Sequence, residues 1–176
     1  MVGNPNAKEG LRAVLDHRLA FLIADSGSAR TALLRRWAAE QSKAQELRIV
    51  FLGLRADDNI PDEFFKHLLL TFQDAGLRLE RCWVAEYADY KAFDLEEGLI
   101  DLINLVDGRV EDYILILDNY EVIDEDTIHT AVEFMLDFLP EKMHVVISSR
   151  VEPPLQVAKL RVRRQLLVLE LEDLLG

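Results

Sequence analysis

Short, wholly apolar runs alternate along the chain with segments whose apolar residues recur every three or four positions. The apolar runs have the length and composition of strands that are buried on both faces of a sheet. Strands are predicted at residues 19–23, 48–54, 113–117, 144–147 and 166–171. The run at 113–117, Tyr-Ile-Leu-Ile-Leu, shows the pattern most clearly.

The segments between these runs have the spacing of helices. Helices are predicted over residues 31–42, 61–72, 95–106, 126–139 and 153–162. Phe64, Leu68 and Phe72 are spaced by four and share one helical face. Pro61 suits a first helical position, and Gly76 is a plausible stop.

Strands that alternate with helices predict βαβ crossovers and a mainly parallel sheet covered on both faces. We therefore expect a three-layer, doubly wound α/β fold. A length of 176 residues fits one domain over 1–176, with a helical lead-in at 1–18 and a core at 19–176. Residues 77–93 fit no clear element.

Ligands of such sheets bind beyond the carboxyl ends of the strands. After the first strand comes a short loop of small residues, 24–30, and then a helix, which is the context of a phosphate-binding loop. Thr31 stands where a hydroxyl would ligate Mg²⁺. Ala24 and Ala29 replace the usual glycines, and Arg30 replaces the usual lysine. The residues predicted to bind a nucleotide here are Ser26, Gly27, Ser28, Ala29, Arg30, Thr31 and Ala32.

Two further strand ends carry candidate residues. Asp118 ends the third strand, where a carboxylate can hold Mg²⁺ together with Thr31, although many strands end in Asp. Asn119 follows it and cannot act as a base, so we expect slow hydrolysis or none. Arg150 follows the fourth strand, where it is either a sensor of the outer phosphate or an ordinary surface arginine.

Composition and charge exclude several classes of protein. Apolar residues make up 50% of the chain, which excludes a disordered protein, and Cys82 is the single cysteine, which excludes a disulfide scaffold. No run approaches the apolar length of a membrane span, and the first residues do not form a secretory signal, so we expect a cytoplasmic protein. Residues 61–140 hold five basic and twenty acidic side chains, so we expect no direct binding of nucleic acid by this chain.

Three stretches of the sequence carry a resemblance to a known family: ADSGSARTALLRRW at 24–37, ILILDNYEVI at 114–123 with His129, and residues 145–174 with their LRVR segment. From Leu19 onward the chain resembles the nucleotide-binding core of STAND-class signal-transduction ATPases. More narrowly, it is similar to the large LuxR-type, maltose-activator-like transcriptional regulators.

The resemblance implies a P-loop NTPase fold with strand order 5-1-4-3-2, and ATP or ADP with Mg²⁺ as ligands. It places Gly27, Arg30 and Thr31 in the Walker A loop, Asp118 in Walker B, and Arg150 at the sensor position. It also implies a signal-responsive switch that works through self-association or through further regulator domains. The helical lid, winged helix and DNA-binding domain of the family are expected to be absent from this chain.

Three functions stay open at this point. The first is a nucleotide-binding switch domain of a transcriptional regulator, at most a weak ATPase. The second is a degenerate P-loop module that binds no nucleotide and serves in structure or self-association. The third, an independent phosphotransferase or ATPase, is disfavoured because Asn119 stands where an acidic base is usual.

Overall fold

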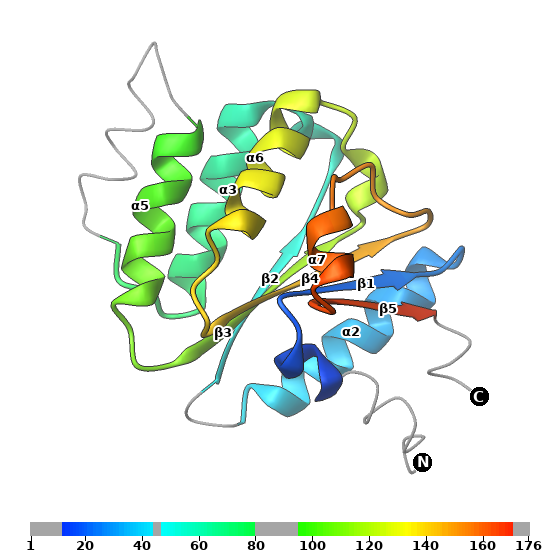
Figure 1. Ribbon diagram of the computed structural model, residues 1–176, viewed down its shortest axis with the longest axis horizontal. Helices are drawn as coiled ribbons and strands as arrows, with labels where there is room; N and C mark the ends of the chain where they lie inside the picture. Colours follow the sequence, from blue (N-terminus) through cyan, green and yellow to red (C-terminus); the bar gives the residue numbers. More distant parts are fainter. Residues whose placement is uncertain (1–11, 44–46, 80–94, 171–176) are drawn as a thin grey trace.

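Five parallel strands form one sheet at the centre of the molecule (Figure 1). The structure is a computed structural model that describes residues 12–43, 47–79 and 95–170. The strands are β1 (Leu19–Ile23), β2 (Leu47–Gly53), β3 (Asp112–Asp118), β4 (Met143–Ser149) and β5 (Leu166–Glu170). Their order is β2-β3-β4-β1-β5, and every neighbouring pair is parallel. The predicted doubly wound P-loop topology, 5-1-4-3-2, is therefore confirmed.

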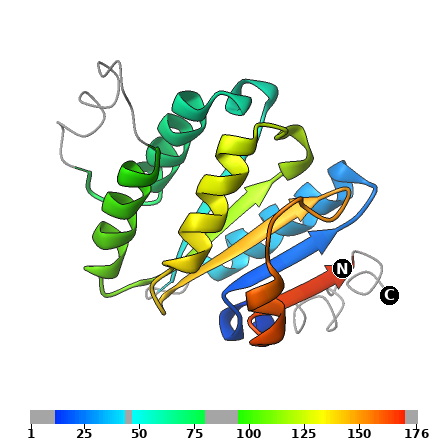
Figure 2. The same cartoon turned by 45° about the horizontal axis from the view of Figure 1, so that its top comes forward.

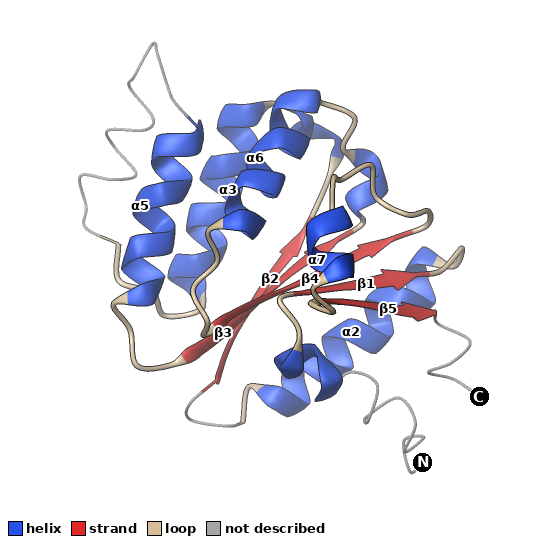
Figure 3. Ribbon diagram, in the orientation of Figure 1, coloured by secondary structure: helices blue, strands red, loops and turns tan. Residues whose placement is uncertain are grey.

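Helices cover both faces of this sheet, as Figure 3 shows by colour. The α-helices are α2 (Gly27–Gln41), α3 (Pro61–Asp74), α5 (Leu95–Asp107), α6 (Asp126–Asp137) and α7 (Ala158–Val162). The 3-10 helices are η1 (Ala13–Asp16), η2 (Ala56–Asn59) and η3 (Tyr120–Val122). α3, α5, α6 and α7 lie on one face, and α2 lies with η1 on the other (Figures 1 and 2). None of the described helices combines the length and apolarity that a membrane span requires.

Side-chain alternation along the strands divides the core into two parts. In β1, Leu19 and Phe21 pack in the larger cluster with residues of α3, α5 and α6. Ala20 and Leu22 pack instead in a smaller cluster with Leu34 of α2. The same alternation runs through β3 and β4. Even-numbered positions of those two strands consequently face α2, the helix that follows the candidate phosphate loop.

The helix α2 begins earlier than predicted. The sequence predicted a loop over 24–30, whereas the structure starts α2 at Gly27 and leaves a loop of residues 24–26. The backbone N–H of Arg30 bonds to the carbonyl of Ser26 at 3.1 Å, which is an ordinary helical bond. Ala29 prefers helical backbone, whereas glycine at this position would allow a loop to turn outward. The extra helical turn takes up part of the predicted phosphate loop.

The last helix is shorter than predicted. We expected a helix over 153–162, and the structure has only Ala158–Val162. Pro154 disfavours helical backbone at the residue before it, and tight backbone bonds join Leu155 to Pro153 and Val157 to Leu155 at 2.8 and 2.9 Å. Of the predicted lead-in at 1–18, residues 1–11 lie outside the described part of the chain, as does most of 77–93.

Gly98 in the middle of α5 has a packing reason. A Cβ at this position would lie 2.6 and 2.8 Å from Cζ and Cε1 of Phe65, a buried residue of α3. Since these distances are shorter than real Cβ contacts, α3 and α5 can approach so closely only at a glycine. Glycine has a poor helix propensity, and the close contact between α3 and α5 compensates for it.

We therefore predict that Gly98→Ala lowers the free energy of unfolding by about 1–3 kcal/mol, although alanine is the better helix former. Urea denaturation measures the change. Asn104→Ala, at an exposed position of the same helix, is the control and should change stability by less than about 0.5 kcal/mol. A gain in stability on Gly98→Ala would contradict the close contact.

Candidate functional site

The predicted site residues meet at the carboxyl edge of the sheet, where β1, β3 and β4 end beside one another. Register aligns Leu117 with Ile147, and Ile23 with Ser149, so the residues that follow these strands are neighbours. Asp118 is the last residue of β3, and the first turns of α2 start just after β1. The structure thus brings together predicted residues that lie far apart in the sequence.

Asp118 lies at the centre of this edge and is buried. One carboxylate oxygen accepts a hydrogen bond from the Thr31 hydroxyl at 2.6 Å. The other accepts one from the Ser148 hydroxyl, also at 2.6 Å. The predicted pair of Thr31 and Asp118 is therefore in direct contact. Its oxygen atoms are of the kind that Mg²⁺ prefers.

Arg30 is the largest fully buried side chain of the described residues, with 0% of its surface exposed. Its Nε donates to the Ser148 hydroxyl, and its Nη1 donates to the carbonyl of Ala24 at 2.7 Å. Its Nη2 donates to Asn119 Oδ1 at 3.1 Å and to Glu121 Oε1 at 2.9 Å. Each guanidinium nitrogen therefore already has an acceptor inside the protein.

The charge of Arg30 is compensated by two carboxylates. Glu121, in η3, contacts it with both oxygens, at 2.9 and 3.2 Å from Nη2. Asp118 lies 3.9 Å from Nε. A buried cation is tolerated when it is paired and hydrogen-bonded, and here each guanidinium nitrogen has an acceptor and two carboxylates lie nearby. A lysine has one ammonium group and lacks the planar fork that lets Arg30 reach these separate acceptors.

Arg150, the predicted sensor, joins the same network. Its Nε lies 3.2 Å from Glu121 Oε1, although 64% of its side chain is exposed. Glu121 thus lies between a buried arginine and an exposed one. We call the group of Arg30, Asp118, Glu121, Ser148 and Arg150 the arginine network.

Asn119 has a structural part in this arrangement. Its backbone is left-handed, with φ 61° and ψ 42°, a conformation that asparagine tolerates better than most residues. This turn starts η3, which carries Glu121, and the Asn119 side chain accepts from Arg30. The residue that stands in the usual place of an acidic base therefore helps to hold Arg30.

The remaining predicted nucleotide-binding residues lie around the start of α2. Ser26 precedes the helix without capping it through its side chain, and Gly27, Ser28 and Ala29 form its first turn. A Cβ on Gly27 would meet Arg30 Nη2 at 3.8 Å, so the helix start adjoins the guanidinium. Backbone N–H groups of a first helical turn can bind an anion. The binding role of these residues and of Ala32 stays a prediction.

Two members of the arginine network were not predicted. Ser148 stands one residue pair beyond the β3–β4 register, beside Asp118, and alternation places both on the α2 face. Strand parity could therefore have indicated Ser148. No comparable signal exists for Glu121, because its position depends on the left-handed turn at Asn119.

The side chains at this edge fit the expected Mg²⁺ ion better than they fit the expected phosphate groups. Thr31 and Asp118 could hold Mg²⁺ by a hydroxyl and a carboxylate oxygen, the arrangement that the resemblance implied. The phosphate half fits less well, because Arg30 is turned inward and three residues are left for the loop. Among the described residues, no group of three or more His, Cys, Asp or Glu side chains could hold a metal ion.

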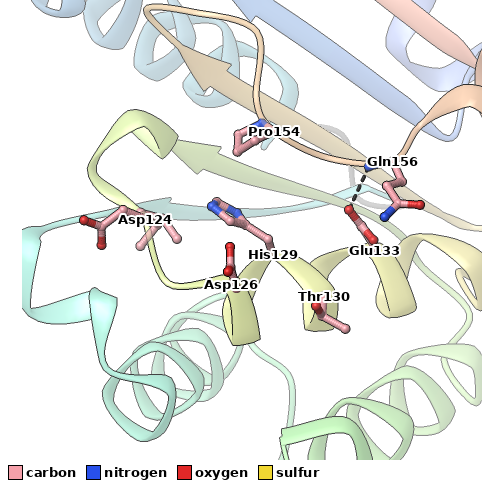
Figure 4. Close-up of a pocket in the computed structure, with 8 residues that line it drawn as sticks. Asp124, Asp126, His129, Thr130, Glu133, Pro154 and Gln156 are labelled. Carbon is pink, nitrogen blue, oxygen red and sulfur yellow. Dashed lines mark hydrogen bonds between the residues drawn. The ribbon is translucent and has the colours of Figure 1, made fainter.

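A separate pocket of about 590 Å³ lies next to α6 (Figure 4). Its lining residues are Ile123, Asp124, Asp126, His129, Thr130, Glu133, Pro154 and Gln156. None of them is a predicted site residue. His129, which helped to carry the resemblance, lies 2.9 Å through Nδ1 from the buried hydroxyl of Tyr120. Burial raises the pKa of Tyr120 far above its ordinary value, so this hydroxyl stays protonated.

Sequence comparison identifies relatives of the chain. It is 32% identical over 167 residues to the HTH-type transcriptional regulator MalT of Yersinia enterocolitica. MalT of Yersinia pestis (strain Pestoides F) matches at 32% over 169 residues, and both alignments cover 93% of this chain. The chain is related to the MalT regulators. It spans 18% of the length of these two relatives, and no family model matches it.

Solved structures of other proteins share the fold of this chain. Cdc6p from Pyrobaculum aerophilum superposes with a TM-score of 0.60 at 16% identity, over 93% of this chain and 43% of that one. The Aeropyrum pernix ORC1 protein, solved in complex with DNA, gives 0.53 at 17% identity, over 96% and 45%. Likeness at such identity shows the fold alone. It confirms the predicted P-loop NTPase architecture, and the MalT match confirms the resemblance drawn from the sequence.

Substitution of the two adjacent serines of β4 provides a test of the arginine network. Ser148 and Ser149 are equally buried, at 0% and 1% exposure, but Ser149 Oγ has no hydrogen-bond partner. We predict that Ser148→Ala lowers the free energy of unfolding by about 1–3 kcal/mol, because it leaves Arg30 and Asp118 each short of a partner. Ser149→Ala should cost clearly less than Ser148→Ala, because it removes a buried hydroxyl that has no partner to lose. Equal losses in urea denaturation would contradict the asymmetry between the two hydroxyls.

Proposed function

We propose that this chain serves a MalT-like transcriptional regulator as a regulatory module of P-loop fold whose nucleotide site is closed in the form described. The module acts through contacts with other parts of the regulator. It neither turns over ATP nor takes up ATP or ADP at micromolar affinity while Arg30 is turned inward. The kinship with MalT supports the regulatory role.

The burial of Arg30 is the main support for a closed nucleotide site. Arg30 occupies the position of the lysine that should reach the outer phosphates, yet it is fully buried and bonded to four internal acceptors. A phosphate that recruited this guanidinium would have to displace Glu121 and Asn119. The energy of breaking these bonds would be subtracted from the energy of binding, so the affinity falls.

Hydrolysis lacks a base at the same site. Asn119 has no carboxylate, and Glu121 is paired with Arg30 and Arg150. Both oxygens of Glu121 contact Arg30, and Oε1 also contacts Arg150, so neither oxygen is left to accept a proton from an attacking water. The sequence predicted at most a weak ATPase. The proposal goes further and expects no hydrolysis of ATP.

The nucleotide-binding switch is the second candidate. It is favoured by the 2.6 Å contact between Thr31 and Asp118, which keeps the predicted Mg²⁺ ligands together. In that case Arg30 leaves its internal partners when ATP or ADP arrives. The two candidates make opposite predictions about the unmodified chain.

Thermal unfolding with and without about 1 mM Mg-ATP or Mg-ADP decides between them. A site with a Kd of about 10 μM would add about 2.7 kcal/mol. In a domain of this size that stabilisation raises Tm by about 5–10 °C. We predict a shift of less than about 1 °C with either nucleotide, and no release of phosphate from ATP.

The control is Asp118→Asn, which keeps the shape of the carboxylate but removes its charge. A rise in Tm that requires Mg²⁺ and disappears in Asp118→Asn would establish the nucleotide switch and overturn the closed site. A rise that is the same in both proteins would reflect a general effect of the anion outside the predicted site.

A further inference from the structure

We propose that Glu121 is a built-in substitute for phosphate, an internal anion that occupies both arginines of the site and thereby sets its affinity for polyphosphate ligands. This inference rests on the proposed function and deepens it, because it names what keeps the site closed. It also assigns a role to a residue that the sequence motifs did not indicate.

The geometry of Glu121 is that of a bound anion. Its two oxygens lie 2.9 and 3.2 Å from Nη2 of Arg30, and Oε1 lies 3.2 Å from Nε of Arg150. One carboxylate therefore contacts two guanidinium groups that come from α2 and from the end of β4. Guanidinium groups bind carboxylate and phosphate oxygens in the same way, so a phosphate could take these contacts if Glu121 released them.

The charges around the site support the same role. The arginine network holds two cations, Arg30 and Arg150, and two carboxylates, Asp118 and Glu121. Both oxygens of Asp118 already accept from hydroxyl groups, so Asp118 is less free to follow Arg30 than Glu121 is. Without the charge of Glu121, two guanidinium groups would face one carboxylate. The edge of the sheet would then attract an anion.

The position of Glu121 also allows its carboxylate to leave the two arginines. It lies in the short helix η3, directly after the left-handed Asn119, and 16% of its side chain is exposed. Solvent can therefore receive this carboxylate when an anion replaces it, whereas Arg30 has no exposed surface. The first turn of α2 adjoins the Arg30 guanidinium at Gly27, and backbone N–H groups of a first helical turn can bind an anion.

The test measures binding of inorganic tripolyphosphate, with and without Mg²⁺, by isothermal titration calorimetry. Glu121→Ala removes both the charge and the side chain, and we expect it to bind tripolyphosphate at least tenfold more tightly than the unmodified chain. Glu121→Gln keeps the shape and one acceptor for Arg30, and the same direction is expected. If both neutral variants fail to fold, Glu121→Asp withdraws the carboxylate by one methylene, and we expect at least a threefold gain.

The matched control is Glu152→Ala. Glu152 is an exposed carboxylate near the same end of the sheet and pairs with Arg161 at 2.8 Å, outside the arginine network. Its loss changes the net charge equally and should leave the affinity for tripolyphosphate unchanged. In the double variant Glu121→Ala, Arg30→Gln, the gain should be lost, because the buried guanidinium is no longer available.

Folded Glu121 variants that bind tripolyphosphate no better than Glu152→Ala would overturn the inference, and so would a gain that persists without Arg30. The proposed function fails by a different result, namely binding of Mg-ATP by the unmodified chain. In that event the role of Glu121 is still decided by the ratio of affinities between its variants and the unmodified chain.

Discussion

A buried guanidinium requires an acceptor for each of its nitrogens and a negative charge nearby, and Arg30 imposes this requirement on the whole carboxyl edge of the sheet. Its acceptors come from the end of β1, from β4 and from the turn after β3. To meet it, Ser148 faces Arg30, Asn119 adopts a left-handed turn, and Glu121 contacts Arg30 with both oxygens. The local shape of the site follows from placing one cation in the interior.

The arginine network explains why several residues differ from those usual in a phosphate-binding loop. Arginine in place of lysine, asparagine in place of an acid and alanine in place of glycine look like three separate losses in the sequence. In the structure Arg30 and Asn119 contact one another, and Ala29 lies in the helical turn that directs Arg30 inward. The substitutions form one coherent arrangement on a sheet that has the strand order expected of a P-loop fold.

Most of the fold could be predicted from the sequence, because buried parallel strands are continuous apolar runs and helices have a distinct period. The meeting of Thr31 with Asp118 also followed, since Asp118 ends β3 and Thr31 lies near the start of α2, the helix that follows β1 at the same edge of the sheet. The direction of Arg30 and the part of Glu121 could not be predicted. Both depend on where α2 begins and how the chain turns at Asn119, and these are set by tertiary contacts between residues about 90 positions apart.

The most direct test of this account is a double-mutant cycle on Arg30 and Glu121. The unfolding free energies of Arg30→Met, Glu121→Gln, the double variant and the unmodified chain give the coupling between the two side chains. A paired, buried arginine predicts a coupling of more than about 1.5 kcal/mol, because each single change leaves the other group without its partner. A coupling below about 0.5 kcal/mol would show that Glu121 does not hold Arg30, and would contradict the closed site.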